Sequence, residues 1–430
     1  MPLAPSLRVR ALVVLSLVAA LAPGLSTPAA AAGRTQSVPR PTAALAHPAP
    51  PTRIHLGDAE AQFTWAAVAG ATGYRVRLTA YGIVRFDRAW SATNVLIDGL
   101  DPEATYEFSV AAVDAAGVGP YSTPAAFTTP FDFVERQFGQ DRFATAARVA
   151  FRAHPFRGID TAFVADGTNF PDALSAAAAA GRMAAPVLLT RPTAVPSATQ
   201  SELTGLAPAR VLVAGGPGAV SDGVMRRLGA TRLAGPDRFD TAAAVSTLWA
   251  SAPTVYLANG MDFPDALAGA AAAGAADAPV LLTRADALPL ATASALARLK
   301  PARIIALGGA AVVSDAVVAE AVAATGVATS AQRLAGANRY DTAVAVSKAA
   351  FRTPGVPVVY IANGTSYADA LAGAAAGGER GGPVLLTQQS ALPAAVFDEV
   401  VRLKPKRIVL LGGPSVVGDG VLARLLTIAH

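Results

Sequence analysis

Six arginines recur at equivalent positions and are the residues best suited to chemistry in this chain. Three of them lie in the first turn of an expected helix, where a cation opposes the helix dipole, so helix stability does not account for them. Arginine presents a planar fork that binds carboxylate or phosphate through two hydrogen bonds. Either these side chains bind an anionic ligand or they pair with nearby aspartates. The first set is Arg142, Arg238 and Arg339, and the second, six residues earlier, is Arg136, Arg232 and Arg333.

Aspartates also recur, and most of them suit helix capping better than catalysis. Asp141 and Asp237 are replaced by Asn338 in the third copy, and a catalytic carboxylate would lose its function there, whereas Asp and Asn are near-equal N-caps. A second set stays acidic in every copy, just before an alanine-rich helix, where a carboxylate in the first turn is favoured by the dipole. No partner base recurs beside it. This set is Asp172, Asp265 and Asp369.

Glycine pairs follow a strand and precede a helix in each copy. Such a turn can expose backbone N–H groups to an anion, or it can simply be a tight connection. The pattern is neither a dinucleotide fingerprint nor a P-loop, because no Gly-Lys-Ser/Thr follows. The pairs are Gly215 and Gly216, Gly308 and Gly309, and Gly412 and Gly413.

Signatures of enzymes and metal sites are missing. The four histidines neither recur nor cluster, and the chain has no cysteine, which excludes thiolate zinc sites and a cysteine nucleophile. His-Glu-x-x-His and Gly-x-Ser-x-Gly motifs are absent as well. The formal charge of +5 is too small to indicate nucleic acid. We therefore expect no catalytic residue, no metal and no cofactor.

These residues lie in a sequence repeat that occurs three times, with expected boundaries at 131–229, 230–330 and 331–430. In the first copy, helices are expected over 141–152, 172–181, 197–206 and 219–228, and strands over 161–166, 187–190 and 210–214. Short, continuously apolar strands between helices indicate a parallel sheet covered on both faces. Each copy is therefore expected to be a small α/β unit.

The first 130 residues are organised differently. Arg8 and Arg10 precede the apolar run 11–22, and small residues follow at 30–32, which predicts a signal peptide over 1–32. Residues 33–48 read as a linker. Short alternating runs separated by turn residues then predict a β-sandwich over 49–130. Trp65, Tyr74 and the segment 100–106, which looks like a tyrosine corner, make it resemble a fibronectin type III domain.

The repeated region resembles the cell wall-binding repeat 2 family, whose members carry three tandem repeats. The resemblance rests on the motifs Asp-Arg-Phe-x-Thr-Ala, Phe-Pro-Asp-Ala-Leu, Pro-Val-Leu-Leu-Thr and Gly-Gly. It implies Toprim-like or flavodoxin-like units in a pseudo-threefold arrangement that anchor secreted proteins non-covalently to anionic polymers of the Gram-positive wall. The motif arginines would then contact the polymer in clefts between units. The Leu-Leu motifs would lie near the trimer contact, at 188–189, 281–282 and 385–386.

The main hypothesis is a secreted, non-catalytic surface protein held on a teichoic-acid-like or other secondary wall polysaccharide. No nucleic-acid partner is expected, and no membrane insertion after cleavage of the signal. Three copies would give avidity toward a repeating anionic polymer. The alternatives are a wall hydrolase with the recurrent aspartates as acids, and an adhesin that uses the β-sandwich. Differences between copies, such as Asp166 for Asn, Asn338 for Asp and Gly418 for Ser, make equal binding by all three unexpected.

Overall fold

The structure is a computed structural model that describes residues 8–10 and 45–428, except 58–59, 81, 99, 101–103, 131–132, 155–157 and 263. It divides into two compact units, Met1–Phe131 and Asp132–His430. Most of the predicted signal peptide and linker, and the middle of the predicted tyrosine corner, lie outside the described residues. None of the helices that the structure describes is long and apolar enough to cross a membrane.

The first unit is a sandwich of two antiparallel sheets, as predicted. In the strand β4 (Gly73–Ala80), every second side chain is buried, because one face of the sheet packs on the core. In that core, the ring centre of Phe63 lies 4.6 Å from that of Phe108 and 5.2 Å from that of Phe127. One sheet has the order β1 (Arg8–Arg10), β6 (Asn94–Asp98), β3 (Glu60–Thr64), β2 (Thr52–Leu56). The other has the order β5 (Ile83–Trp90), β4 (Gly73–Ala80), β7 (Thr105–Asp114), β8 (Gly117–Tyr121), and β9 (Ala125–Thr128) also pairs with β7.

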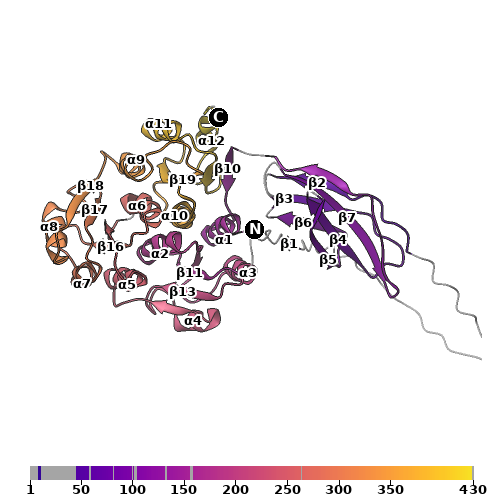
Figure 1. The fold of residues 1–430 in the computed structure, drawn as a ribbon, viewed down its shortest axis with the longest axis horizontal. Helices are drawn as coiled ribbons and strands as arrows, with labels where there is room; N and C mark the ends of the chain where they lie inside the picture. Colours follow the sequence, from indigo (N-terminus) through magenta and orange to yellow (C-terminus); the bar gives the residue numbers. More distant parts are fainter. Residues whose placement is uncertain are drawn as a thin grey trace, which may run out of the picture. The chain divides into compact units, whose positions relative to one another are not determined.

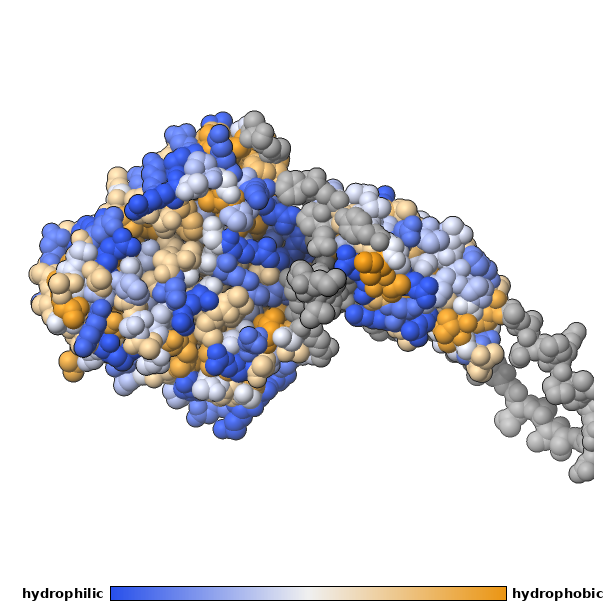
Figure 2. Space-filling view, in the orientation of Figure 1, coloured by the Kyte–Doolittle hydropathy of each residue, from blue (hydrophilic) through white to orange (hydrophobic). Residues whose placement is uncertain are grey.

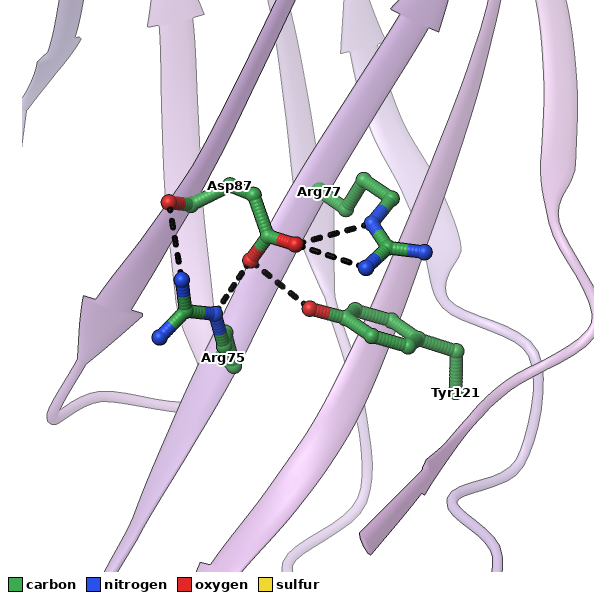
Figure 3. Close-up of polar contacts among 4 residues, drawn as sticks. All are labelled: Arg75, Arg77, Asp87 and Tyr121. Carbon is green, nitrogen blue, oxygen red and sulfur yellow. Dashed lines mark hydrogen bonds and ion pairs between the residues drawn. The ribbon is translucent and has the colours of Figure 1, made fainter. Parts of the chain in front are cut away.

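A polar cluster on the second sheet holds its edge strand β5 in place (Figure 3). Asp87 on β5 accepts hydrogen bonds from Arg75 and Arg77 on β4, and from the Tyr121 hydroxyl at 2.7 Å. The Arg77 guanidinium lies 3.8 Å from the centre of the Tyr121 ring. Burial opposes ionisation of Asp87, but the three donors outweigh it and lower the pKa of its carboxyl group. The three donors thus share the Asp87 carboxylate as their acceptor, which indicates a structural role for this cluster.

The second unit contains three parallel four-stranded sheets. In the first, alternate side chains of β11 enter opposite hydrophobic layers, Phe163 and Ala165 on one side and Ala162 and Val164 on the other. Both faces are therefore covered by helices, as the continuous apolar strands predicted. The order is β12 (Val187–Thr190), β11 (Thr161–Asp166), β13 (Arg210–Ala214), β14 (Thr231–Leu233). The helices are α1 (Arg142–Ala153), α2 (Pro171–Arg182), α3 (Ser197–Leu206) and α4 (Asp222–Leu228). This strand order is that of the first four strands of flavodoxin-like folds.

The other two repeats follow the same plan. In the second, the strands are β15 (Thr254–Asn259), β16 (Val280–Thr283), β17 (Arg303–Leu307) and β18 (Ser330–Leu334). Its helices are α5 (Arg238–Val245), the short η1 (Ser246–Leu248), α6 (Pro264–Ala275), α7 (Leu290–Leu299) and α8 (Asp315–Ala324). In the third, β19 (Val359–Asn363), β20 (Val384–Thr387) and β21 (Ile408–Leu411) alternate with α9 (Arg339–Ala350), α10 (Ala368–Arg380), α11 (Ala394–Leu403) and α12 (Asp419–Leu425).

The sheets cross the boundaries of the sequence repeats. The strand that opens the second repeat, β14, completes the first sheet, and β18, which opens the third, completes the second. The strand that opens the first repeat, β10 (Val134–Gln137), pairs in parallel with β21 at the end of the chain and completes the third sheet. The exchange is cyclic, so the three repeats form a closed ring.

Three alanine-rich helices, α2, α6 and α10, pack on one another at the middle of the ring (Figure 1). Their closest approach is at Gly181, Gly274 and Gly378, where a Cβ on any one glycine would lie 3.1 to 3.3 Å from the Cα atoms of the other two. Only small residues permit such close packing of three helices. Each of these helices also contacts the Leu-Leu strand of a neighbouring repeat: α10 contacts β12, α2 contacts β16 and α6 contacts β20. The predicted place of the Leu-Leu motifs at the contact between repeats is thus confirmed.

Candidate functional site at the repeat junctions

Each pair of neighbouring repeats meets at a polar cluster beside the carboxyl ends of the strands. At the 1–2 junction, Asp172 in the first turn of α2 accepts a hydrogen bond from Thr241 on α5 of the next repeat, and the charge of Arg238 acts on it. In parallel α/β sheets, ligands bind outside these strand ends, where the strand order reverses. The 2–3 junction contains Asp265, Thr342 and Arg339, and the 3–1 junction contains Asp369, Thr145 and Arg142.

The motif threonine connects two repeats through both of its hydrogen-bonding roles. The hydroxyl oxygen of Thr241 accepts from the backbone N–H of Gly235 at 3.4 Å, which leaves its proton for the carboxylate of Asp172. At the other two junctions, the corresponding N–H to hydroxyl distances are 3.1 Å. The recurrence of threonine at this position of the motif is therefore explained by hydrogen bonds that connect neighbouring repeats.

The first glycine of each Gly-Gly pair is required by this geometry. Gly215, Gly308 and Gly412 have φ angles of +126°, +92° and +106°, which L side chains rarely adopt. A Cβ there would lie 2.8, 2.4 and 2.9 Å from the Oδ2 atom of the motif aspartate of the same repeat. Their N–H groups donate to carbonyls of the exchanged strands, at 2.9 to 3.1 Å. These contacts favour a tight turn over an anion site.

Burial dominates the electrostatics of the motif aspartates. It raises the pKa of Asp172 to about 6, against the opposing effects of the Arg238 charge and the Thr241 hydrogen bond. Burial likewise raises the pKa of Asp265 and of Asp369, and Thr and Arg of the next repeat again oppose it. As predicted, these carboxylates lie in the first turn of a helix. Their raised pKa follows from burial in the folded protein, which local sequence does not specify.

The first arginine set lies at the junctions. Arg142, Arg238 and Arg339 each donate Nη1 to a backbone carbonyl, of Gly167, Gly260 and Gly364 respectively, always at 2.7 Å. Arg142 also donates to the hydroxyl of Tyr367 in the third repeat, at 3.1 Å. Because each guanidinium has five donors, one or two such bonds leave others for a ligand.

The second arginine set is more fully occupied by the protein itself. Arg136, Arg232 and Arg333 lie on the exchanged strands and donate to the carbonyl of the first glycine of the Gly-Gly turn. Each also forms an ion pair with an aspartate that begins the last helix of the same sheet, at 2.6 to 3.0 Å. These aspartates are Asp419, Asp222 and Asp315. The contacts attach each exchanged strand to its host repeat.

The turn and capping predictions are confirmed, and the differences between copies have structural effects. Asp141, Asp237 and Asn338 cap their helices by accepting from backbone N–H groups. Asn259 and Asn363 accept in an Asx turn and also donate to a carbonyl across the sheet edge. Their counterpart Asp166 makes the same turn with Thr168, but its carboxylate has no N–H group for the second bond. Similarly, the helix caps Ser221 and Ser314 are replaced by Gly418, which has no side chain to accept.

Sequence reasoning missed two arginines at the junctions. Arg191 and Arg284 directly follow the Pro-Val-Leu-Leu-Thr motif in the first and second repeats, where the third repeat has Gln388. Both arginines are exposed, and their guanidinium carbons lie 4.8 and 4.9 Å from the ring centres of Phe143 and Phe239. Recurrence in two copies out of three was the available signal.

The comparison with protein families agrees with this architecture. The model of cell wall binding domain 2 matches residues 136–225, 232–318 and 333–422, which is more than half of the chain. The chain belongs to the cell wall binding domain 2 family. Each matched range begins at or beside an exchanged strand. The fibronectin type III model matches residues 48–128, the part that folds as the β-sandwich.

The chain is similar to parts of longer proteins. The chain is 27% identical over 298 residues to the N-acetylmuramoyl-L-alanine amidase LytC of Bacillus subtilis (strain 168), covering 68% of this chain and 58% of LytC. It is 30% identical over 264 residues to an amidase enhancer of the same organism, covering 59% of this chain and 36% of that protein. The chain thus spans between a third and three fifths of the lengths of these relatives. The solved structure of Cwp6 from Clostridium difficile has the same fold, with a TM-score of 0.64, 19% identity, and coverage of 86% of this chain and 66% of Cwp6.

Proposed function

We propose that this chain is a secreted, non-catalytic surface protein whose three repeats attach it to an anionic polymer of a Gram-positive cell wall. The observation that carries the proposal is the arrangement of Arg142, Arg238 and Arg339, one at each junction of a ring whose family is named for cell wall binding. Their remaining donors suit carboxylate or phosphate groups. A repeating polymer is the ligand that gains most from three sites.

The polarity of the surface supports a ligand bound at several places. On the face shown in Figure 2, the most hydrophilic residues form several separate patches on the repeat unit, with mildly hydrophobic areas and small strongly hydrophobic spots between them. A large apolar patch would instead favour a protein or membrane partner. The signal peptide predicted over 1–32 and the β-sandwich fit the same proposal, as an export signal and as a spacer.

Sedimentation with purified cell-wall sacculi tests the proposal. We expect the protein to sediment with native sacculi, to stay in solution with sacculi stripped of anionic polymers, and to bind less as salt increases. Substituting Arg142, Arg238 and Arg339 together by Gln should abolish sedimentation of a folded protein. Binding that survives stripping would refute the anionic ligand, and binding that survives the triple substitution would refute the arginine assignment.

A wall hydrolase is the second candidate, because the pKa of about 6 for Asp172 is suitable for a general acid near neutral pH. However, the Asp172 carboxylate packs against Gly215 and accepts from Thr241, so structural contacts explain both its burial and its position. Release of soluble sugar or peptide fragments from sacculi, abolished by Asp172→Asn, would establish this alternative. No release is expected from the wild type.

A further inference from the structure

We propose that the three junctions bind an anionic polymer unequally, with the 3–1 junction strongest and the 2–3 junction weakest, and that Arg191 and Arg284 are the residues responsible for the difference. The inference rests on the proposed function and adds the rank of the sites and two contact residues. It follows from side chains that differ between copies while the backbone plan is the same.

The side chains of Arg191 and Arg284 are each stacked on a phenylalanine ring and form no ion pair among the described residues. Among the described residues, neither guanidinium has a hydrogen-bond or ion-pair partner, although the charge of Arg284 lowers the pKa of Asp237 nearby. Stacking on a buried phenylalanine restricts the side chain while its edge stays exposed. Such an arginine can donate to a ligand with little loss of conformational freedom.

Each stacked arginine lies in the same cluster as the junction arginine. Phe143, under Arg191, directly follows Arg142 in α1, and a Cβ on Gly167 would lie 2.7 Å from its ring. Gly167 is also the residue whose carbonyl accepts from Arg142. Gly260 joins Phe239 and Arg238 in the same way, with a ring distance of 2.9 Å. Two arginines therefore converge on one strand end in the first and second repeats, and one does so in the third.

Acidic residues distinguish the 3–1 junction from the other two. The third residue after the helix cap is Ala144 at the 3–1 junction, whereas it is Asp240 and Asp341 at the other two. Counting the cap, the junction arginine, this residue, the motif aspartate and the residue after the Leu-Leu-Thr motif, the 3–1 junction has two arginines against two carboxylates. The 1–2 junction has two arginines against three carboxylates, and the 2–3 junction has one against two. Asp166 also acts on the motif aspartate of the 1–2 junction and Asp262 on that of the 2–3 junction, which adds one carboxylate to each. An anion is thus repelled least at the 3–1 junction, and the other two junctions, whose net charges are equal, differ in the number of arginines that can bind it.

The test measures sedimentation with native sacculi as a function of protein concentration. Because an exposed charge pair contributes up to about 1 kcal/mol, the removal of one arginine should weaken binding at its own junction about fivefold. We expect the largest loss for Arg191→Gln, a smaller one for Arg284→Gln, and tighter binding for Gln388→Arg. Ala144→Asp, which copies the other two repeats, should weaken binding without disturbing the helix. Arg226→Gln is the control, because Arg226 is an exposed arginine in the last turn of α4.

The outcomes separate this inference from the proposed function. A wild-type protein that does not bind sacculi refutes both. A wild type that binds, together with Arg191→Gln and Arg284→Gln variants that match the Arg226→Gln control, refutes only the inference. Equal losses for all substitutions, or no gain for Gln388→Arg, refute the ranking. Soluble polyphosphate and polyglutamate serve as competitors, and displacement by one, the other or both identifies the acid group, whereas displacement by neither refutes arginine contacts.

Discussion

The two glycines of one turn should respond very differently to the same substitution. Gly308 has a φ of +92°, and an added Cβ would lie 2.4 Å from the Oδ2 atom of Asp265, whereas a Cβ on Gly309 would have no heavy atom within 4 Å. A left-handed conformation costs a non-glycine residue about 1–2 kcal/mol. Displacing the Asp265 carboxylate would also lose its hydrogen bond from Thr342, about 1 kcal/mol more. Gly308→Ala should therefore destabilise the protein by about 2–3 kcal/mol, and Gly309→Ala by less than about 0.5 kcal/mol.

Urea unfolding followed by circular dichroism is the appropriate assay, with the wild type and both variants compared at one pH. The expected result is a lower midpoint for Gly308→Ala and an unchanged one for Gly309→Ala, with similar slopes. Equal effects of the two substitutions would show that the turn tolerates side chains at both positions. In that case, the close packing of aspartate against glycine would not be the reason for the Gly-Gly motif.

Three further predictions follow from the same structure. Burial raises the pKa of Glu379 to about 7 against the charge of Arg380. Folding therefore favours the protonated form, and this contribution is complete below the unfolded pKa near 4.5 and lost as pH rises through 7. Glu379→Gln should accordingly lose less stability than the wild type between pH 4.5 and 7, as measured by urea midpoints, and parallel curves would contradict it. Arg136→Ala, Arg232→Ala and Arg333→Ala should each cost about 2 kcal/mol in unfolding free energy, because each loses charged hydrogen bonds to carbonyl groups. If Arg136→Ala left the unfolding free energy unchanged, the contacts of Arg136 with Gly412 and Asp419 would not stabilise the closed ring. Asp141→Ala and Asn338→Ala should each cost about 1 kcal/mol of unfolding free energy through lost caps, as measured by thermal unfolding. Asn338→Asp should keep the cap but still lower the melting temperature, because it loses the hydrogen bond that Asn338 donates to Asp341 and places two carboxylates together.

Periodicity was sufficient to predict most elements of the repeats. Val187–Thr190, Ser197–Leu206 and Arg210–Ala214 are observed with the expected bounds, because apolar runs and turn residues delimit them locally. The expected closing helix over 219–228 begins later, at Asp222, because residues before the Ser221 cap form a turn closed by the Gly216 carbonyl. The difference is small and purely local.

The exchanged strands could not be predicted, because their identity depends on distant partners. Thr231–Leu233 has three residues and a polar centre, so no alternation marks it as a strand. The same limit applies to the arginines of the second set. Their recurrence was visible, but Arg136 finds its aspartate 283 residues away, and no spacing within a copy reveals that pair. The shifted pKa of Asp172 is likewise a property of the junction.

The cyclic exchange also bears on the order of folding. Arg136 and the Gly412 carbonyl that it binds are 276 positions apart in the sequence, so β10 is made long before its partner β21. The entropy cost of joining such distant segments grows only slowly with length, so the completed chain can close readily. Before residues 408–411 exist, however, the first strand has no sheet to join. A chain cut short before residue 408 would leave that strand unpaired and exposed to other chains or to proteases. Synthesis of β21 is therefore the step that allows the ring to close.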